Sequence, residues 1–160
     1  MKSQSGFTLV EMVAVIIILA VLAANALPKF TSLSGDARYS SLNALMGGFR
    51  SAVTLSRAKW LVAQSGTLDS VDFNGTAVSV INLGTVGSAV TNLGSPLATG
   101  TGIDRAMDSL GTYTSGTDGV GGVSYWPTGV TTSSSCYVNY LSGTVTITPN
   151  TAATATSACS

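Results

Sequence analysis

The sequence predicts an α+β protein, in which one long N-terminal helix packs on an antiparallel β-sheet of about four strands. Apolar residues run almost without interruption from position 7 to 27, and an apolar stripe with helical spacing continues to about position 63. After Gly66 the chain changes to short runs with alternating polarity, separated by Gly, Ser and Asn, which is typical of strands and turns. The two cysteines, Cys136 and Cys159, close the predicted architecture with a C-terminal disulfide loop.

The composition limits the classes of function. Charged residues make up 9% of the 160 residues, against about 25% in ordinary soluble domains, and seven basic residues balance seven acidic ones. We therefore expect neutral polar side chains to solvate the surface, and no basic patch is available for nucleic acid. The absence of histidine removes the commonest general base and metal ligand. We expect no enzymatic activity, no cofactor and no metal site.

The cysteine count favours a disulfide. An even number of cysteines in an exported chain predicts pairing, whereas a metal site at Cys136 and Cys159 would need further ligands that histidine cannot supply here. Closing the loop between them would stabilise the fold by about 3 kcal/mol in the chain-entropy model. A disulfide also implies an oxidising compartment.

The N-terminal apolar run has two interpretations. Phe7–Leu27 holds 21 residues, with Thr8, Glu11 and Asn25 as its only polar side chains. A helix of this length spans about 30 Å, one hydrocarbon thickness. Alternatively, the run is a secretory signal cleaved after Ala26, at Ala24-Asn25-Ala26. The charge of Glu11 at the start of the run and the helical pattern beyond Ala26 argue against that alternative.

The stretch Ser5-Gly6-Phe7-Thr8-Leu9-Val10-Glu11 resembles the processing site of type IV prepilins. In that family a short basic leader ends in glycine, the new N-terminal residue is N-methylated, a glutamate stands at the fifth mature position and a proline often stands at the twenty-second. Gly6, Phe7, Glu11 and Pro28 match these positions in register. The resemblance implies a leader over residues 1–6 and a retained membrane and filament-core helix over residues 7–28.

The carboxylate of Glu11 also has two interpretations. Cleavage after Gly6 would create an amine on Phe7, and a carboxylate in an apolar setting needs an opposite charge. In a filament, the amine of one subunit would meet Glu11 of its neighbour and set the register between copies. The alternative is that Glu11 caps the start of the helix, where the macrodipole favours an acid.

The second part of the helix, residues 29–65, is predicted to be amphipathic and to lie against the sheet. Pro28 is expected to kink the helix between its two parts, because proline removes one backbone hydrogen bond. The helix is predicted to stop at Ser65-Gly66. Its apolar stripe consists of Phe30, Leu33, Ala37, Leu42, Leu45, Phe49, Val53, Trp60 and Ala63.

Residues 66–160 are predicted to form a β-rich head. Asn74-Gly75 predicts a tight hairpin turn within VDFNGTAVSVINLG, and Asn74-Gly75-Thr76 is also an N-glycosylation sequon. Residues 84–102 are expected to be loop. Ile103–Leu110 is expected to be a short helix that carries Asp104 and Asp108 as solvated acids, with a cation site as the alternative.

The last part of the head is expected to begin with a loop, GTYTSGTDGVGG. Three strands follow, GVSYW, CYVNYL and TVTITP, and Ser142-Gly143 is expected to turn the last two into a hairpin. The aromatic residues of these strands are expected to fill the core, with a carbohydrate-binding surface as the alternative. They are Tyr125, Trp126, Tyr137 and Tyr140.

The segments LPKFTSLSGDARYSSLNALMGGF and SSCYVNY look most like major pilins of the mannose-sensitive haemagglutinin group, and the family commonly carries a C-terminal disulfide. The resemblance implies a structural subunit that polymerises with itself into a surface filament for adhesion, attachment or twitching. Its partners would be a prepilin peptidase and methylase, an assembly platform with its ATPase, and the inner membrane of a Gram-negative bacterium before assembly. The alternatives are a pseudopilin of a type II secretion system, a minor pilin, or a secreted protein cleaved after Ala26.

Overall fold

The computed structural model describes residues 6–63, 68–82, 92–107, 110–118, 121–130, 136–148 and 159, without the side chains of residues 31 and 32. It confirms the predicted α+β fold, with a long N-terminal helix, antiparallel sheets and a C-terminal disulfide. The elements are α1 (Leu9–Val62), β1 (Ser70–Phe73), β2 (Thr76–Ser79), α2 (Ile103–Ala106), β3 (Tyr113–Thr117), β4 (Val123–Pro127), β5 (Tyr137–Leu141) and β6 (Thr144–Thr148).

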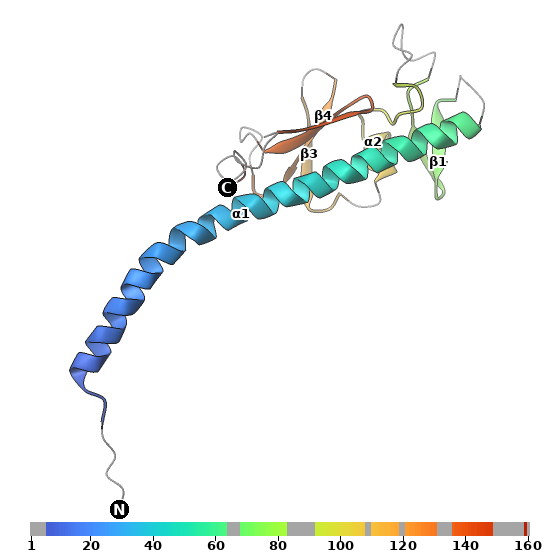
Figure 1. Ribbon diagram of the computed structural model, residues 1–160. Helices are drawn as coiled ribbons and strands as arrows, with labels where there is room; N and C mark the ends of the chain where they lie inside the picture. The colour runs from blue at the N-terminus through green and yellow to red at the C-terminus, as the bar shows by residue number, and fades with distance from the viewer. Residues whose placement is uncertain are drawn as a thin grey trace, which may run out of the picture.

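The helix α1 has two environments along its length. Its N-terminal half extends away from the rest of the molecule, whereas the β-rich head lies along one side of its C-terminal half (Figure 1). The helix ends at Val62, where the Ala63 N–H donates to the carbonyl of Lys59. This end comes earlier than the predicted stop at Ser65-Gly66, which lies outside the described residues.

The larger sheet is an antiparallel meander with strand order β3-β4-β5-β6. β3 corrects the prediction of a loop, because Tyr113–Thr117 pairs along its whole length with Val123–Pro127. The β5–β6 turn confirms the hairpin predicted at Ser142-Gly143, with φ of 46° and 89° at these two residues. Positive φ at both central positions is the turn geometry that matches the twist of the flanking strands.

The main core lies between α1 and the inner face of this sheet. Phe49 is fully buried, and its ring centroid is 4.8 Å from that of Tyr125 and 6.1 Å from that of Tyr140. Leu42, Leu45 and other apolar residues of the helix join it against Val138 and Cys136. The expectation that the aromatic residues of the strands serve the core is therefore confirmed for Tyr125 and Tyr140, and Trp126 is also buried.

The hairpin β1–β2 forms a second, smaller cluster. Asn74 and Gly75 occupy its turn with φ of 52° and 85°, which confirms the predicted turn. Val71, Val78 and Val80 are buried there, with Trp60 of α1 packed against them.

The helix α2 is shorter than predicted, since it ends at Ala106 and Met107 is already extended. Asp104 was expected to be a solvated acid, but its Oδ1 accepts a hydrogen bond from the hydroxyl of the buried Tyr125. Asp108 lies outside the described residues.

Polar side chains attach the segment around Gly94 to α1. The fully buried Ser56 hydroxyl donates to the Gly94 carbonyl at 2.9 Å. Arg57 donates from Nε to the Ser95 hydroxyl at 2.8 Å and from Nη2 to the Asn92 side-chain oxygen at 3.1 Å. These bonds connect the helix to a loop that shows no apolar pattern in the sequence.

The head covers less of the apolar stripe than predicted. Phe30 is 67% exposed, Leu33 is 57% exposed, and Ala37 is exposed as well, whereas Leu42 and Leu45 are buried. Apart from Gly35, the buried face of α1 therefore begins only near Tyr39, and the uncovered apolar surface of the helix continues past Pro28.

Candidate processing and assembly site

The predicted cleavage site lies just before α1. Gly6, Phe7 and Thr8 are not helical, and Thr8 has the extended backbone (φ −84°, ψ 152°) of an N-cap residue. Phe7 is 76% exposed, and no atom would lie within 4 Å of a Cβ built on Gly6. The peptide bond between Gly6 and Phe7 is therefore in exposed, non-helical chain, the kind of segment that proteases cut most readily.

The alternative site after Ala26 has a different environment. Ala24, Asn25 and Ala26 lie inside α1, with helical chain on both sides. The side-chain amide of Asn25 donates to the carbonyl of Val21 at 2.9 Å, so this polar group is satisfied within the helix itself. Cleavage after Ala26 would require the middle of the helix to unwind.

Glu11 forms a capping box with Thr8. Its Oε2 accepts from the Thr8 backbone N–H at 2.8 Å and from the Thr8 hydroxyl at 3.0 Å, while the Glu11 N–H donates to the Thr8 hydroxyl oxygen at 3.3 Å. The Thr-x-x-Glu spacing thus satisfies two backbone donors that the first turn of a helix leaves open. The cap proposed as the alternative role of Glu11 is present in the chain before cleavage.

This cap leaves the carboxylate able to accept a further bond. An ionised carboxylate has two oxygens with about four acceptor positions. Both side-chain bonds of Glu11 found among the described residues use Oε2. The Oε1 oxygen of Glu11 would be available to an amine, so capping and charge pairing are compatible.

The first half of α1 is an apolar rod, by which we mean residues 7–28. All its large apolar side chains lie on the surface of the single chain, with exposed fractions between 41% and 80%. An 18-residue window of α1 has a mean hydropathy of 2.5 and is 0% buried, and by length and composition the helix can cross a membrane. A rod that is apolar on every side must be covered by lipid or by other protein.

Pro28 lies inside α1, and the helix continues through it as one element. Proline has no N–H to donate to the carbonyl of Ala24, so the helix is weakened on that side. Figure 1 shows α1 as curved along its N-terminal half rather than broken at one residue.

The disulfide Cys136–Cys159 is formed, with 5.1 Å between the two Cα atoms, and both cysteines are fully buried. Cys159 is also bonded to α1, because Nη1 of Arg38 donates to its carbonyl oxygen at 2.7 Å. The two cysteines could be predicted from the sequence, whereas the contact of Arg38 could not. Among the described residues no group of three His, Cys, Asp or Glu side chains could hold a metal ion.

A known family motif matches the N-terminus of the chain. Residues 1–24 match the prokaryotic N-terminal methylation motif, which covers Gly6, Phe7 and Glu11. The capping box and the start of the apolar rod therefore belong to a motif found in proteins that are methylated at the N-terminus.

The chain is similar to curated proteins that are named as a fimbrial protein and as type IV major pilins. The chain is 35% identical over 85 residues to a fimbrial protein of Neisseria meningitidis, and the match covers 50% of each chain. It is 43% identical over 60 residues to the type IV major pilin protein PilE1 of Neisseria gonorrhoeae, over 36% of each chain. The chain thus spans about half the length of the curated relatives it matches, or less. No solved structure matches the chain.

Proposed function

We propose that this protein is a type IV pilin that polymerises with itself into a surface filament as the major subunit. The observation that carries the proposal is the exposed apolar rod that continues, within the same helix, into a disulfide-bonded head. Such a chain needs apolar partners along the rod and water around the head. In a membrane, lipid would cover the rod of the stored subunit while its head stays in water. In a filament, the rods of other copies would cover it, and the heads would again face water.

The processing step follows from the position of Gly6. A prepilin peptidase removes residues 1–6, and its methylase activity modifies the amine of Phe7. The exposed, non-helical chain around this bond and the methylation motif both support this step. The chain is inserted in the inner membrane of a Gram-negative bacterium before assembly and is exposed on the cell surface afterwards.

Assembly transfers the rod from lipid to protein. Lipid tails are about as apolar as leucine side chains, so burial of the rod contributes little to this transfer. Side-chain packing and pairing between the Phe7 amine of one copy and Glu11 of its neighbour contribute the rest, together with an ATPase that acts through a membrane platform. In a copy at the wrong axial position, both ions would remain unpaired at low dielectric.

The finer assignment is to the major pilins of the mannose-sensitive haemagglutinin group, on the resemblance around residues 25–60 and 123–160. The filament serves adhesion, surface attachment or twitching motility, and the protein is structural rather than enzymatic. A pseudopilin and a minor pilin would share the same N-terminus.

The test combines electron microscopy with N-terminal mass analysis. Filaments sheared from the cells that make this protein are expected to consist of chains that begin with N-methylated Phe7. Chains that begin at Leu27 would overturn the proposal. Deleting the gene separates the remaining classes: a major pilin is needed for any filament, whereas loss of protein secretion with normal filaments would indicate a pseudopilin.

A further inference from the structure

The sequon Asn74-Gly75-Thr76 forms the tip of the β1–β2 hairpin. All three residues are exposed to solvent. The hairpin lies beside the C-terminal end of α1, at the opposite end of the molecule from the apolar rod (Figure 1). A modification at this tip would obstruct neither the rod nor the main core between α1 and β4–β5.

The turn does not depend on the amide of Asn74. Asp72 Oδ1 accepts a hydrogen bond from the Gly75 N–H at 3.2 Å, which ties the two sides of the turn together. Among the described residues, the Asn74 side chain takes part in no hydrogen bond. Its Nδ2 is therefore accessible and unused, whereas the Asn25 amide is bonded within its helix.

The hairpin itself is held to α1. Nζ of Lys59 donates to the Asp72 carbonyl and lies 4.7 Å from the centroid of the Phe73 ring. Because these contacts fix the strands and not the turn, the tip is presented to solvent on a rigid base.

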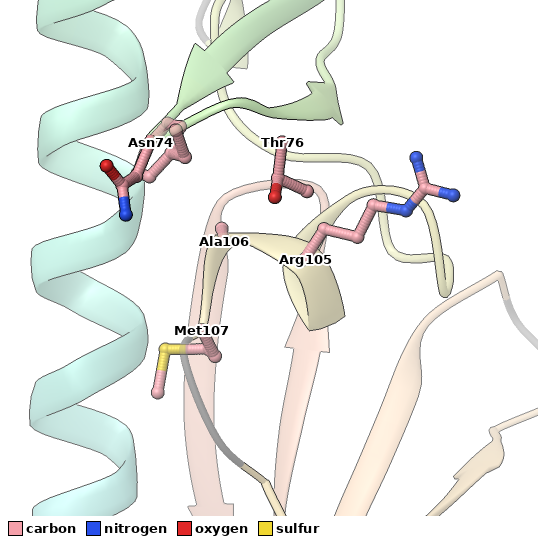
Figure 2. A pocket seen from close by; sticks show the side chains of 6 residues that line it. Asn74, Thr76, Arg105, Ala106 and Met107 are labelled. Carbon is pink, nitrogen blue, oxygen red and sulfur yellow. The ribbon is translucent and has the colours of Figure 1, made fainter.

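A hollow of about 520 Å³ adjoins the acceptor side chain. Figure 2 shows the lining side chains: Asn74 and Thr76 come from the β1–β2 hairpin, Ala106 and Met107 come from the end of α2, and the Arg105 guanidinium points away from Asn74. Phe73 completes its lining. Apolar surface from Phe73 and Met107 together with the hydroxyl of Thr76 suits a sugar ring, which has apolar faces and a polar edge, whereas Nη1 of Arg105 already donates to the Ala77 carbonyl at 3.2 Å.

We propose that Asn74 is an N-glycosylation site whose first sugar lies over this hollow. The proposal rests on the proposed function only in that the head must be exported. The co-reactant is an oligosaccharide joined through pyrophosphate to a membrane lipid. Nδ2 of Asn74 forms a bond to the anomeric carbon of the sugar, the bond from that carbon to the pyrophosphate oxygen breaks, lipid pyrophosphate leaves, and Nδ2 gives up one proton.

The hydroxyl of Thr76 is the second requirement of the sequon. Thr76→Ser keeps this hydroxyl, whereas Thr76→Val removes it and retains the β-branched shape that a strand favours. Asn74→Asp keeps a short residue that tolerates the left-handed turn but removes the acceptor nitrogen. These three variants separate the chemistry of the sequon from the folding of the hairpin.

The test is peptide mass mapping of the full-length chain, purified from the envelope of the cells that make it. In the wild type and in Thr76→Ser, the peptide that contains Asn74 is expected to carry the mass of one or more sugar residues. In Thr76→Val and Asn74→Asp, the same peptide is expected to lose that mass completely. The envelope fraction is expected to contain all four chains at similar levels.

An unmodified Asn74 in the wild type would overturn the proposal, as would a peptide in which Asn74 has only deamidated to aspartate. Retention of the sugar in Thr76→Val would place it on another residue and would also overturn it. The N-terminal peptide of the same digest reports cleavage at Gly6 and methylation of Phe7. Failure of the glycosylation proposal is thereby distinguished from failure of the pilin proposal.

Discussion

Arg38 on α1 donates a hydrogen bond from Nη1 to the carbonyl oxygen of Cys159 across a distance of 2.7 Å. The two residues are 121 positions apart in the chain, and Cys159 is fully buried. The second attachment of Cys159 is its disulfide to Cys136, directly before β5. The end of the head is thus joined both to the helix and to the sheet.

Arg38→Ala is expected to lower the free energy of unfolding by about 1.5–3 kcal/mol, because the buried carbonyl of Cys159 loses a charged donor. Urea unfolding of the full chain in detergent, followed by the fluorescence of Trp60 and Trp126, measures the change. Arg50→Ala is the matched control, since Arg50 is exposed on the same helix, and it should shift stability by less than about 0.5 kcal/mol. Equal effects of the two substitutions would contradict the assigned role of Arg38.

Replacing both cysteines, Cys136→Ser with Cys159→Ser, is expected to cost about 3 kcal/mol, because the open loop gains conformational entropy when the head unfolds. The same urea titration measures it, and the yield of surface filaments should fall. The double variant avoids a free thiol. An unfolding midpoint equal to that of the wild type would show that the disulfide contributes nothing to the stability of the head.

Glu11→Gln separates the two roles of Glu11. Glutamine at this position can still complete a capping box with Thr8, but it carries no charge. We therefore expect Glu11→Gln to leave cleavage after Gly6 intact and to reduce filament number or Phe7 methylation as strongly as Glu11→Ala does. Electron microscopy and the mass of the N-terminal peptide are the measurements.

Thr8→Ala is the reciprocal control for Glu11, because it removes the cap and keeps the charge. It is expected to retain assembly, with a loss of about 1 kcal/mol in helix stability. Normal filaments in Glu11→Gln together with defective ones in Thr8→Ala would assign the whole effect to capping.

Gly94→Ala is expected to destabilise the head more than Gly129→Ala. Both glycines have positive φ, 76° and 89°, so alanine is strained at each by about 1–2 kcal/mol. A Cβ on Gly94 would also lie 2.9 Å from Cβ of Trp60 and 3.2 Å from Cα of Arg57, whereas nothing lies within 4 Å at Gly129. The clash should add about 1–3 kcal/mol at Gly94 alone. Equal thermal midpoints of the two variants would contradict this packing.

The stability of the head is expected to fall at alkaline pH. Burial raises the pKa of Tyr125 above its ordinary value of 10.0, and the hydrogen bond to the Asp104 carboxylate raises it further; burial also raises the pKa of Tyr140. Below pH 10 both tyrosines keep their protons in the folded and the unfolded chain, so they add no pH dependence. Above pH 10 the tyrosines of the unfolded chain lose their protons before those of the folded chain do. The free energy of unfolding therefore falls by about 1.4 kcal/mol per pH unit for each tyrosine.

Urea titrations between pH 8 and pH 11 would measure this slope, roughly spanning the unfolded pKa of tyrosine. Tyr140→Phe removes one of the two groups, together with its hydrogen bond to the Pro96 carbonyl, and should be less stable at neutral pH but have a shallower alkaline slope. A slope unchanged by this substitution would exclude Tyr140 as a cause.

Elements with a strong local pattern could be predicted from the sequence. Asn74-Gly75 and Ser142-Gly143 specify their turns through the backbone, and the spacing of Leu42, Leu45 and Phe49 specifies the buried face of α1. The candidate processing site could be located because Gly6 and Glu11 match a motif whose residues lie close together in the sequence. The capping box was predictable for the same reason.

Elements that depend on distant residues could not be predicted. β3 looked like a loop because it contains Gly116, but a Cβ there would lie 2.8 Å from the Trp126 ring of the neighbouring strand, so the glycine makes room for an indole. The role of Asp104 depends on Tyr125, which lies on β4 and is 21 positions away in the chain. Ser56 did give a signal, since a small polar residue on the apolar stripe of α1 implies a buried hydrogen-bond partner, which is the Gly94 carbonyl.

The exposure of Phe30 and Leu33 has a consequence for the membrane-inserted subunit that the proposed function requires. From Leu9 to Leu33 the helix rises about 36 Å, more than the roughly 30 Å of hydrocarbon in a bilayer. A helix with this mismatch tilts or leaves its last apolar turn among the lipid headgroups. The head of a membrane-inserted subunit would then lie closer to the membrane surface. Transfer of the subunit into a filament would remove this tilt of α1.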